Sequence, residues 1–417
     1  MSGFPFFKYH DATFFVESVS LDKISQEFGT PCYVYSQAAL TNAYRDLDAA
    51  FAGRNHLLCY AVKANPNLAI LNLFARLGSG FDIVSGGELR RVLKAGGDPQ
   101  KIVFSGVGKS SDEIRAALSE NILCFNVESE AELRTLNQIA KEMDRVASVS
   151  LRVNPDVDAK THPYISTGLK ENKFGIPFDE AERLYFSVGK LTNIRMTGLD
   201  FHIGSQLTKL APFSEACKKA IDLLDRLEDK KLQIDHLDFG GGLGIRYSKE
   251  NPPSVQSYVA ALCADLGHRT QRILIEPGRS LVGNAGLLLT RIEYLKHTPY
   301  RDFAIVDAAM NDLIRPALYD AYHEILPVTV NGQNTKTYQI VGPVCETGDF
   351  LGYDRKLSLS QGDLLAVMSA GAYGMSMSSN YNTRPRAAEV MVDGDNTHII
   401  RERESIEQLF ANERVLP

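Results

Sequence analysis

The chain has 417 residues, 44% hydrophobic and 23% charged, which is the composition of a soluble globular protein with about two domains. Its formal net charge of −6 and pI near 5.9 exclude a general affinity for nucleic acid or anionic membrane surfaces. Because no apolar run approaches the roughly 20 residues that span a bilayer and the first residues show no signal-peptide pattern, the sequence predicts a cytoplasmic protein.

Eight short β-branched or apolar runs, most of them separated by helical patterns, precede residue 281. They are Leu57–Val62, Phe81–Val84, Ile102–Phe104, Ile122–Val127, Val149–Val153, Thr197–Ile203, His236–Phe239 and Ile273–Glu276. Because parallel strands need helical crossovers and eight of them close on a filled interior, this α/β alternation predicts a (β/α)8 barrel over residues 36–280. The interval 154–193 is longer than one crossover requires and predicts an additional loop or helix.

Amphipathic segments supply the predicted crossover helices. Residues 67–77, 129–143 and 213–227 repeat apolar side chains every three to four positions. Ser111 and Asp112 stand where the N-terminal caps of a further short helix are expected. The segments between the strands therefore have the pattern that a parallel barrel requires.

After about Leu281, strand-like runs succeed one another with little intervening helix. They are Leu287–Leu295, Phe303–Val306, Ile325–Val330, Thr337–Val341, Leu364–Met368 and Ala388–Val392. This succession predicts an antiparallel β domain of Greek-key or sandwich type over residues 281–417. Two N-terminal runs, Thr13–Val16 and Cys32–Tyr35, have the same character, so residues 1–35 are expected to complete that domain around an inserted barrel.

Unusual residues fall at the ends of the predicted barrel strands, where chemistry collects in barrels of this kind. In chain order they are Lys63, Asp82, Arg152, His202, Gly240-Gly241-Gly242 and Glu276-Pro277-Gly278-Arg279. Because the carboxyl ends of parallel strands meet at one face, this recurrence predicts a single active site there.

Lys63, the glycine run and Glu276 each have an ordinary and a functional interpretation. A lysine after an apolar strand is usually solvated, but at a barrel mouth its amine could be desolvated and reactive toward a carbonyl. Gly240–Gly244 is either a flexible turn or a backbone cradle for phosphate, and it lacks the pattern of an ATP loop. Glu276 could pair with Arg279, or it could face the pyridine nitrogen of a cofactor.

The other polar candidates are equally open from the sequence. His202 is either a hydrogen-bonded core histidine or a flat ring that stacks on an aromatic cofactor. Ser205 and Tyr373 could donate hydroxyl groups to a phosphate, although a tyrosine among small residues is also ordinary β-domain packing. Arg315 and Tyr319 are surface residues by default, but an arginine in an apolar-rich segment invites a carboxylate partner.

Six widely separated cysteines without a Cys-x-x-Cys pair indicate reduced thiols. The nine histidines show no metal-binding spacing, so no metal site is predicted. Cys345 stands between a Gly-Pro turn and the acids Glu346 and Asp349. It is less easily buried there than an ordinary cysteine, and it could be a proton donor.

Taken together, these motifs resemble the fold-type III pyridoxal-phosphate enzymes, which include decarboxylases of basic amino acids and alanine racemase. The resemblance extends over nearly the whole chain and rests on Tyr60–Asn65, Phe201–Ser205, Gly240–Gly242, Glu276–Arg279, Cys345–Asp349 and Tyr373. It implies a barrel that binds pyridoxal 5'-phosphate, a β domain, and a head-to-tail homodimer whose active sites are shared between subunits.

The resemblance also implies a role for each residue. Lys63 would hold the cofactor, His202 would stack on its ring, and Glu276 would pair with the pyridine nitrogen. Cys345 of the neighbouring subunit would return a proton to the substrate. The implied phosphate contacts are Ser205, Gly241, Gly242, Arg279 and Tyr373.

Arg315 and the Cys345–Gly348 motif resemble the diaminopimelate branch of the family. They imply decarboxylation of meso-2,6-diaminopimelate at its D-centre to L-lysine and CO2, the last step of lysine biosynthesis. The implied substrate contacts are Arg279, Arg315, Tyr319, Glu346 and Tyr373, with the arginines on the distal carboxylate and Glu346 on the amine. Ornithine, arginine or carboxynorspermidine are alternative substrates. A racemase is disfavoured by Glu276, and a non-catalytic cofactor-binding regulator is the alternative from another class.

Overall fold

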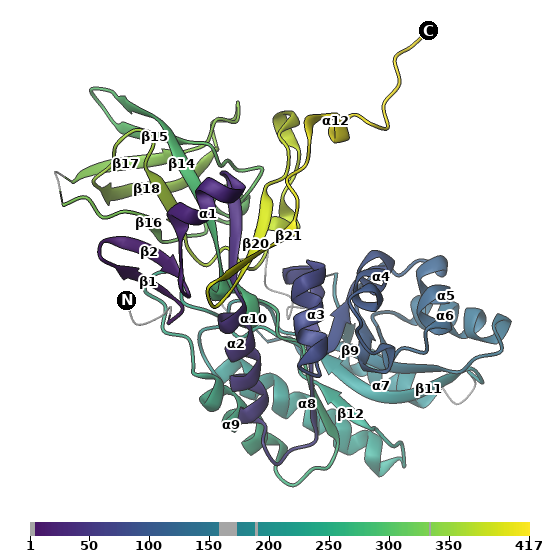
Figure 1. Ribbon diagram of the computed structural model, residues 1–417. Coiled ribbons are helices and arrows are strands. Elements are labelled where there is room, and N and C mark those ends of the chain that lie inside the picture. The colour runs from purple at the N-terminus through teal and green to yellow at the C-terminus, as the bar shows by residue number, and fades with distance from the viewer. Residues whose placement is uncertain (1–4, 158–172, 188–190, 333–334) are drawn as a thin grey trace. The chain divides into compact units, whose positions relative to one another are not determined.

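The computed structural model of the chain describes residues 5–157, 173–187, 191–332 and 335–417 (Figure 1). The chain divides into two compact units. The barrel unit consists of Tyr44–Ile245 and Asn251–Ser280, and the β unit consists of Met1–Ala43, Arg246–Glu250 and Leu281–Pro417. The barrel unit is thus inserted between N-terminal and C-terminal parts of the β unit.

Eight parallel strands close into a barrel, as the sequence predicted. They are β5 (His56–Ala61), β6 (Gly80–Ile83), β7 (Ile102–Phe104), β8 (Cys124–Val127), β9 (Ala147–Asn154), β11 (Ile194–Phe201), β12 (His236–Asp238) and β13 (Arg272–Ile275). The pairing of β8 with β9 completes the ring. A two-residue strand, β10 (Ile176–Pro177), pairs with the end of β9.

The helices that lie between the strands are α3 (Leu68–Arg76), α4 (Gly86–Lys94), α5 (Ser111–Ser119), α6 (Glu130–Glu142), α7 (Phe178–Ser187), α8 (Ala211–Asp229) and α9 (Val255–Leu266). Five of them (α3, α4, α5, α6 and α9) begin at a serine or asparagine cap whose side chain accepts a hydrogen bond from a first-turn N–H group. The three predicted amphipathic helices are confirmed as α3, α6 and α8.

The structure differs from the sequence prediction at the cap of α5, and it shows what part of the long interval before β11 contains. The cap of α5 is Ser110, which forms a reciprocal capping box with Glu113. The predicted caps Ser111 and Asp112 were therefore wrong by one residue, because they lie inside the first turn. The long interval before β11 contains β10 and α7, and residues 158–172 of that interval lie outside the described part of the chain.

The β unit is built on a sheet in the order β18-β17-β15-β14-β4-β20-β21, with β19 paired to β14 and β16. Its strands are β4 (Cys32–Ser36), β14 (Gly286–His297), β15 (Asp302–Val306), β16 (Ile325–Pro327), β17 (Lys336–Val341), β18 (Phe350–Leu357), β19 (Leu364–Val367), β20 (Ala388–Asp393) and β21 (Asn396–Arg401). The pairs β15–β17 and β4–β20 are parallel, so the sheet is mostly rather than wholly antiparallel.

The two N-terminal runs behave differently. The run at Cys32–Tyr35 is β4, which lies between β14 and β20 and completes the sheet as expected. The run at Thr13–Val16 is β2, which instead pairs with β1 (Phe7–His10) and β3 (Val19–Ser20) in a small separate sheet. An isolated bridge from Thr13 to Thr329 and a hydrogen bond from Phe14 N–H to Val328 O, at 2.8 Å, join that run to the segment after β16.

Short elements complete the two units. They are α1 (Leu21–Phe28), α2 (Gln37–Ala50), α10 (Arg279–Val282), α11 (Arg315–Tyr319), α12 (Ile406–Leu409) and the 3-10 turns η1 (Val62–Ala64), η2 (Pro99–Lys101), η5 (Gly283–Ala285), η6 (Met375–Met377) and η7 (Tyr381–Thr383). A buried apolar cluster in the β unit packs α1 against β2, β4, β14 and β19.

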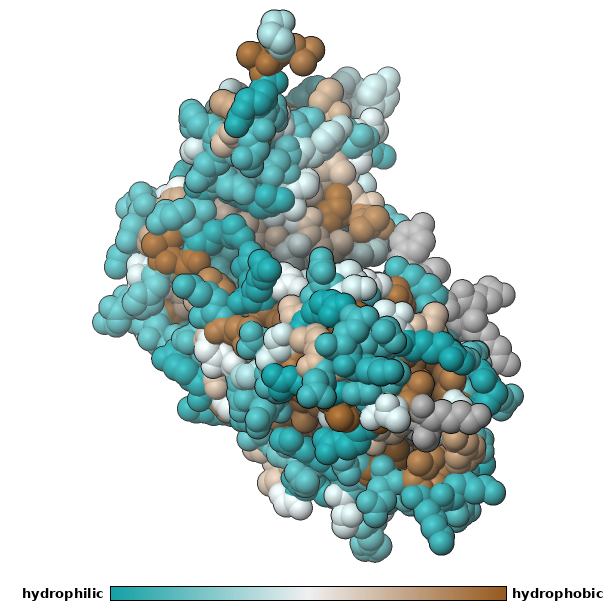
Figure 2. Space-filling view, turned by 90° about the vertical axis from the view of Figure 1, so that its right-hand side faces the viewer, coloured by the Kyte–Doolittle hydropathy of each residue, from teal (hydrophilic) through white to brown (hydrophobic). Residues whose placement is uncertain are grey.

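The surface presented in Figure 2 is mostly hydrophilic, with apolar residues in scattered patches. Individual apolar side chains that are almost fully exposed include Tyr300, Val415 and Leu416. Among the helices of the described residues, none combines the length and the apolar character that crossing a bilayer would require.

Candidate active site

The barrel interior changes from apolar to polar toward the carboxyl ends of its strands. Leu57, Cys59, Val103, Cys124 and Leu274 form one buried apolar cluster. Because side chains two positions apart in a strand share a face, the next inward positions follow directly from this cluster. The positions two residues after Val103, Cys124 and Leu274 are occupied by Ser105, Asn126 and Glu276, respectively. An apolar floor therefore lies beneath a polar layer.

Glu276 belongs to that polar layer and lies one residue beyond β13. Its Oε1 accepts hydrogen bonds from Ser105 Oγ and Asn126 Nδ2, both at 3.4 Å, and Asn126 Nδ2 also lies 3.2 Å from Ser105 Oγ. All three residues are buried. This network fixes the Glu276 carboxyl at the inner end of the strand.

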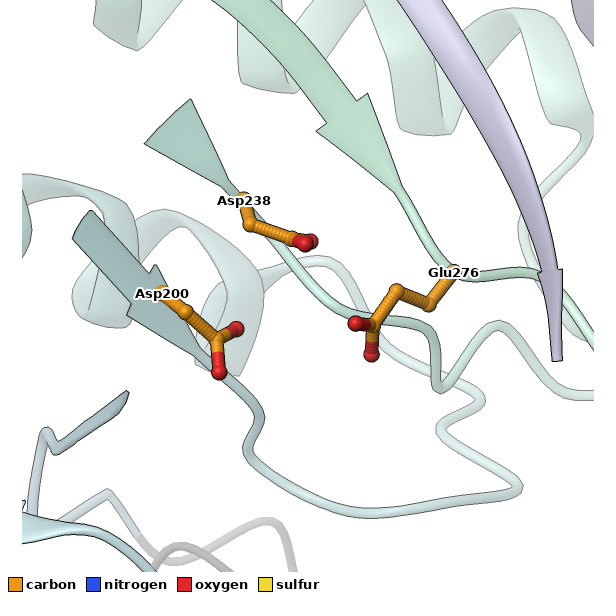
Figure 3. Close-up of side chains that lie close together, drawn as sticks. All are labelled: Asp200, Asp238 and Glu276. Atoms are coloured by element: carbon orange, nitrogen blue, oxygen red, sulfur yellow. The ribbon is translucent and has the colours of Figure 1, made fainter. Parts of the chain in front are cut away.

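Asp200 and Asp238 join Glu276 in a buried group of three carboxyls, which we call the acid trio. Figure 3 shows the three side chains converging from β11, β12 and the segment after β13. One oxygen from each lies within 4.8 Å of the others. Asp238 Oδ1 accepts a hydrogen bond from Gly240 N–H at 2.9 Å. Asp200 Oδ1 and Asp238 Oδ2 are buried without a hydrogen-bond partner among the described residues.

Burial and mutual repulsion favour the protonated forms of the acid trio. Burial raises the pKa of Glu276 well above its ordinary value, and the carboxyls of Asp238 and Asp82 raise it further. Burial is also the main cause of the raised pKa of Asp238 and of Asp200. Like charges so close together in a poorly solvated interior cannot all ionise. The trio is therefore suited to sharing a proton with a bound group.

Lys63 lies in η1, immediately after β5, and its ammonium faces Asp82 of the neighbouring strand. The Lys63 Nζ to Asp82 Oδ2 distance is 2.5 Å, and the Asp82 side chain is fully buried whereas that of Lys63 is 38% exposed. Asp82 is the register partner of Ala61 in β5 and β6, and Lys63 follows Ala61 by two residues. Lys63 is thus an accessible amine anchored over the polar layer.

His202 follows β11 and is a neutral imidazole. Loss of hydration in its packed surroundings lowers the pKa of His202 well below the ordinary value, and the positive charges of Arg152 and Lys63 lower it further. Its Nδ1 accepts a hydrogen bond from Gly241 N–H at 3.1 Å, so the ring proton is on Nε2. A flat uncharged ring, oriented by the glycine run, is the form that stacks on another aromatic ring.

The glycine run after β12 is packed so closely that side chains are excluded. A Cβ on Gly241 would lie 2.3 Å from the backbone oxygen of Glu276, and one on Gly242 would lie 2.6 Å from that of Gly204. Gly242 also has a φ of +112°, which residues with a Cβ rarely adopt. The crowding shows that the glycine run is a packed segment and not merely a flexible turn.

The barrel residues that remain from the sequence prediction are two arginines and a serine, Arg152, Arg279 and Ser205. Arg279 is buried at the start of α10, and its Nη2 donates to Ser205 Oγ at 3.0 Å. Arg152 pairs with Glu128 at 3.3 Å and is buried, so its charge lies inside the polar layer. The barrel unit therefore brings together Lys63 with the other predicted residues of this unit, which are His202, Ser205, Gly241, Gly242, Glu276 and Arg279.

The remaining predicted residues belong to the β unit. Arg315 and Tyr319 are the first and last residues of α11, with Arg315 buried and Tyr319 half-buried. Tyr373 is half-buried and has a φ of +55°, an uncommon backbone conformation for a residue with a side chain. Their predicted contacts with substrate and phosphate remain predictions.

Cys345 and Glu346 are exposed on a tight turn of the β unit. Asp349, which is buried, holds this turn by accepting hydrogen bonds from Val344 N–H at 2.8 Å and from Met310 N–H at 2.6 Å. Cys345 N–H donates to Asn382 Oδ1 at 2.9 Å. Of the six cysteines, four are buried and Cys263 is half-buried, whereas Cys345 is exposed.

Sequence reasoning missed the acid trio's two aspartates, although a signal was present. Asp200 precedes His202 by two residues, and Asp238 interrupts the apolar run that ends at Phe239. The rule that selected Lys63 and Glu276 at strand ends applies equally to both aspartates. Glu128, which pairs with Arg152, lies at the end of β8 and carries the same signal.

The barrel residues fit pyridoxal phosphate, the cofactor that the sequence resemblance implied. An accessible amine at Lys63 suits an aldehyde, and the raised pKa of Glu276 suits a partner that shares a proton with a ring nitrogen. The side-chain-free cradle at Gly241 and Gly242 suits a phosphate. The buried carboxylate oxygens without hydrogen-bond partners among the described residues suit a cationic ring.

Comparison with known proteins agrees with this chemistry. The sequence profile of the family described as pyridoxal-dependent decarboxylase, pyridoxal binding domain, matches residues 37–283. The chain is 59% identical to the diaminopimelate decarboxylase of Pseudomonas aeruginosa, with 99% of each chain covered. It is 56% identical to that of Vibrio cholerae, again with 99% of each chain covered.

Solved structures show the same similarity. The diaminopimelate decarboxylase of M. jannaschii superposes with a TM-score of 0.96 at 38% identity, covering 100% of this chain and 99% of that one. The enzyme of Helicobacter pylori, solved in complex with L-lysine, superposes with a TM-score of 0.91 at 43% identity, covering 94% of this chain and 98% of that one.

Proposed function

The chain belongs to the pyridoxal-dependent decarboxylase family, in the branch of the diaminopimelate decarboxylases, and we propose that it converts meso-2,6-diaminopimelate to L-lysine and CO2. The reaction is the last step of lysine biosynthesis. The single observation that carries the proposal is the full-length identity of 59% to a relative of that name, with the chemistry of the barrel intact.

Bound pyridoxal phosphate supplies an electron-accepting ring, which takes up the electron pair when the substrate's Cα–carboxylate bond breaks. Lys63 would hold the aldehyde end of the cofactor. His202 covers the ring face as a neutral imidazole, a state that its hydrogen bond from Gly241 N–H and its lowered pKa both support. Ser205, the glycine run, the Arg279 backbone and Tyr373 would bind the phosphate.

Glu276 controls the electron demand of the ring. Burial raises the pKa of Glu276 and so favours its protonated form, which could share that proton with the pyridine nitrogen. Such a partner supports full electron withdrawal by the ring, which a decarboxylase needs when its Cα–carboxylate bond breaks. The hydrogen bonds from Ser105 and Asn126 hold the Glu276 carboxyl in one position during this exchange.

Cys345 returns a proton to Cα, and it does so across a subunit interface. We infer a head-to-tail homodimer in which the exposed Cys345 turn of one subunit enters the active site of the other. The outward presentation of this thiol, on a turn held by Asp349, supports that arrangement. An exposed reactive thiol also suits the reducing cytoplasm.

The distal end of the substrate determines the specificity. Diaminopimelate carries a second carboxylate and a second amine there, whereas ornithine carries an amine alone. Arg279 and Arg315 bind the carboxylate through charge-assisted hydrogen bonds, and Glu346 binds the amine. Tyr319 and Tyr373 complete this pocket.

The test is to load the purified protein with pyridoxal phosphate, add meso-diaminopimelate, and measure both lysine and CO2. Ornithine, arginine and carboxynorspermidine are offered in parallel at equal concentration. We expect equimolar lysine and CO2 from diaminopimelate and at least tenfold lower release from the others, since a lost charged contact costs about 1.5–3 kcal/mol. Preferential release from one of the others would contradict the proposed substrate.

A further inference from the structure

Arg315 is held inside the β unit by two aromatic neighbours. Its Nη1 donates a hydrogen bond to His323 Nε2 at 2.9 Å. Its guanidinium carbon lies 4.7 Å from the centre of the Tyr247 ring, in a cation–π contact. The Tyr247 and His323 rings meet edge to face, with centroids 5.3 Å apart. The guanidinium is therefore fixed both along one edge and over one face.

His323 is a neutral imidazole with a defined proton position. A guanidinium can only donate, so His323 Nε2 must be the acceptor of the bond from Arg315. A backbone carbonyl can only accept, so His323 Nδ1 must donate to Met368 O, at 2.8 Å. The ring is completely buried, and the two bonds together determine its tautomer and its orientation.

A neutral partner has a consequence that a carboxylate partner would not have. A carboxylate would hold the guanidinium and add a negative charge beside it, whereas the His323 imidazole fixes its direction without adding one. The Tyr247 ring acts in the same way, because a π face attracts the cation without cancelling its charge. This contact set is suited to presenting Arg315 as an oriented cation to an anionic ligand.

We propose that His323 and Tyr247 are positioning residues that hold Arg315 for the distal carboxylate of the substrate, and so set the preference for diaminopimelate over amino acids without that carboxylate. The inference rests on the proposed function, since it gives Arg315 the substrate contact assigned there. Neither residue touches the reacting atoms. Both act through the direction of the guanidinium.

The test uses two variants of His323 in the cofactor-loaded enzyme. In His323→Asn, the amide can still donate to Met368 O but is too short to accept from Arg315. In His323→Gln, the side-chain oxygen reaches the position of Nε2 and restores that acceptor. We expect His323→Asn to raise KM for meso-diaminopimelate about tenfold with kcat within about twofold of wild type, and His323→Gln to remain within about threefold on both.

Ligand binding provides a readout that a general loss of structure would not move. L-lysine retains the distal carboxylate of the substrate, and cadaverine lacks it. Calorimetry on the cofactor-loaded enzyme should show that His323→Asn lowers the affinity for L-lysine about tenfold and the affinity for cadaverine by less than about twofold. Tyr247→Leu should behave in the same way, while Tyr247→Phe, which keeps the π face, serves as its matched control.

The outcomes separate this inference from the proposed function. If the wild-type enzyme makes no lysine from meso-diaminopimelate, the proposed function fails. If the wild type makes lysine but His323→Asn keeps the wild-type KM, only the positioning role is overturned. The same holds if His323→Asn loses affinity for L-lysine and for cadaverine equally. Should His323→Asn fail to fold, the Tyr247→Leu and Tyr247→Phe pair decides the question, by the change in L-lysine affinity relative to the change in cadaverine affinity.

Discussion

Gly242→Ala tests whether the glycine run is a packed cradle or only a turn. A Cβ at this position would lie 2.6 Å from Gly204 O and 2.6 Å from a methyl carbon of Leu207. Gly96 offers a matched control, because its φ of +84° is also positive but a Cβ there would meet nothing within 4 Å. The two substitutions therefore share the backbone cost and differ in crowding.

The expected magnitudes follow from that difference. A Cβ in the left-handed region costs about 1–2 kcal/mol at either position. Crowding against a backbone oxygen that cannot move alone adds about 1–3 kcal/mol at Gly242. Urea denaturation of the cofactor-free protein should therefore show Gly242→Ala to be less stable than Gly96→Ala by that second amount.

Cofactor binding should separate the two variants further. The cradle is displaced in Gly242→Ala, so its affinity for pyridoxal phosphate should fall about tenfold or more, while Gly96→Ala should bind normally. Fluorescence titration with the cofactor measures this difference. Equal stability and equal affinity of the two variants would refute the cradle and return the glycine run to an ordinary turn.

Three further predictions concern single residues. Cys345→Ala should bind cofactor normally but lose about 10²–10⁴ in kcat, and near-normal turnover would remove the thiol from the mechanism. Asp349→Ala should lower kcat without lowering cofactor affinity, because the Cys345 turn loses the hydrogen bond from Val344 N–H and the bond from Met310 N–H that ties the turn to its neighbour; unchanged kcat would show that the turn holds itself. Burial raises the pKa of Glu88 from 4.5 to about 7, so the folded protein keeps a proton that the unfolded chain releases, and stability falls as pH rises through this window. Glu88→Gln should therefore make the cofactor-free protein about 1–3 kcal/mol more stable at pH 8 and leave it unchanged at pH 4, as measured by urea denaturation; a gain of equal size at both pH values would argue against the raised pKa.

The barrel could be predicted because its strands are short, apolar and separated by amphipathic helices. In the β unit, β18 and β21 were missed, since Phe350–Leu357 carries an internal glycine and several charges, and Asn396–Arg401 is largely exposed. Edge strands with one solvated face lack the apolar run by which the inner strands were recognised. Inner strands could therefore be predicted because their burial requires an apolar run, whereas these edge strands are held by backbone pairing, which leaves no such run in the sequence.

The part of the candidate site that lies at the ends of the barrel strands could be predicted from the sequence. Residues at strand ends are brought together by the barrel itself, so Lys63 and Glu276 could be placed from the sequence. The contact between Arg315 and His323 depends on the reversal after α11, where Asp320 adopts a left-handed conformation. No periodicity encodes such a loop, so that contact is visible only in the structure.

The most direct measurement of the central claim compares wild type with Lys63→Ala after loading with pyridoxal phosphate. We expect the wild type to show the visible absorbance of the lysine-bound cofactor and to release lysine from meso-diaminopimelate. The variant should show neither. Persistence of both signals without the Lys63 amine would contradict the account.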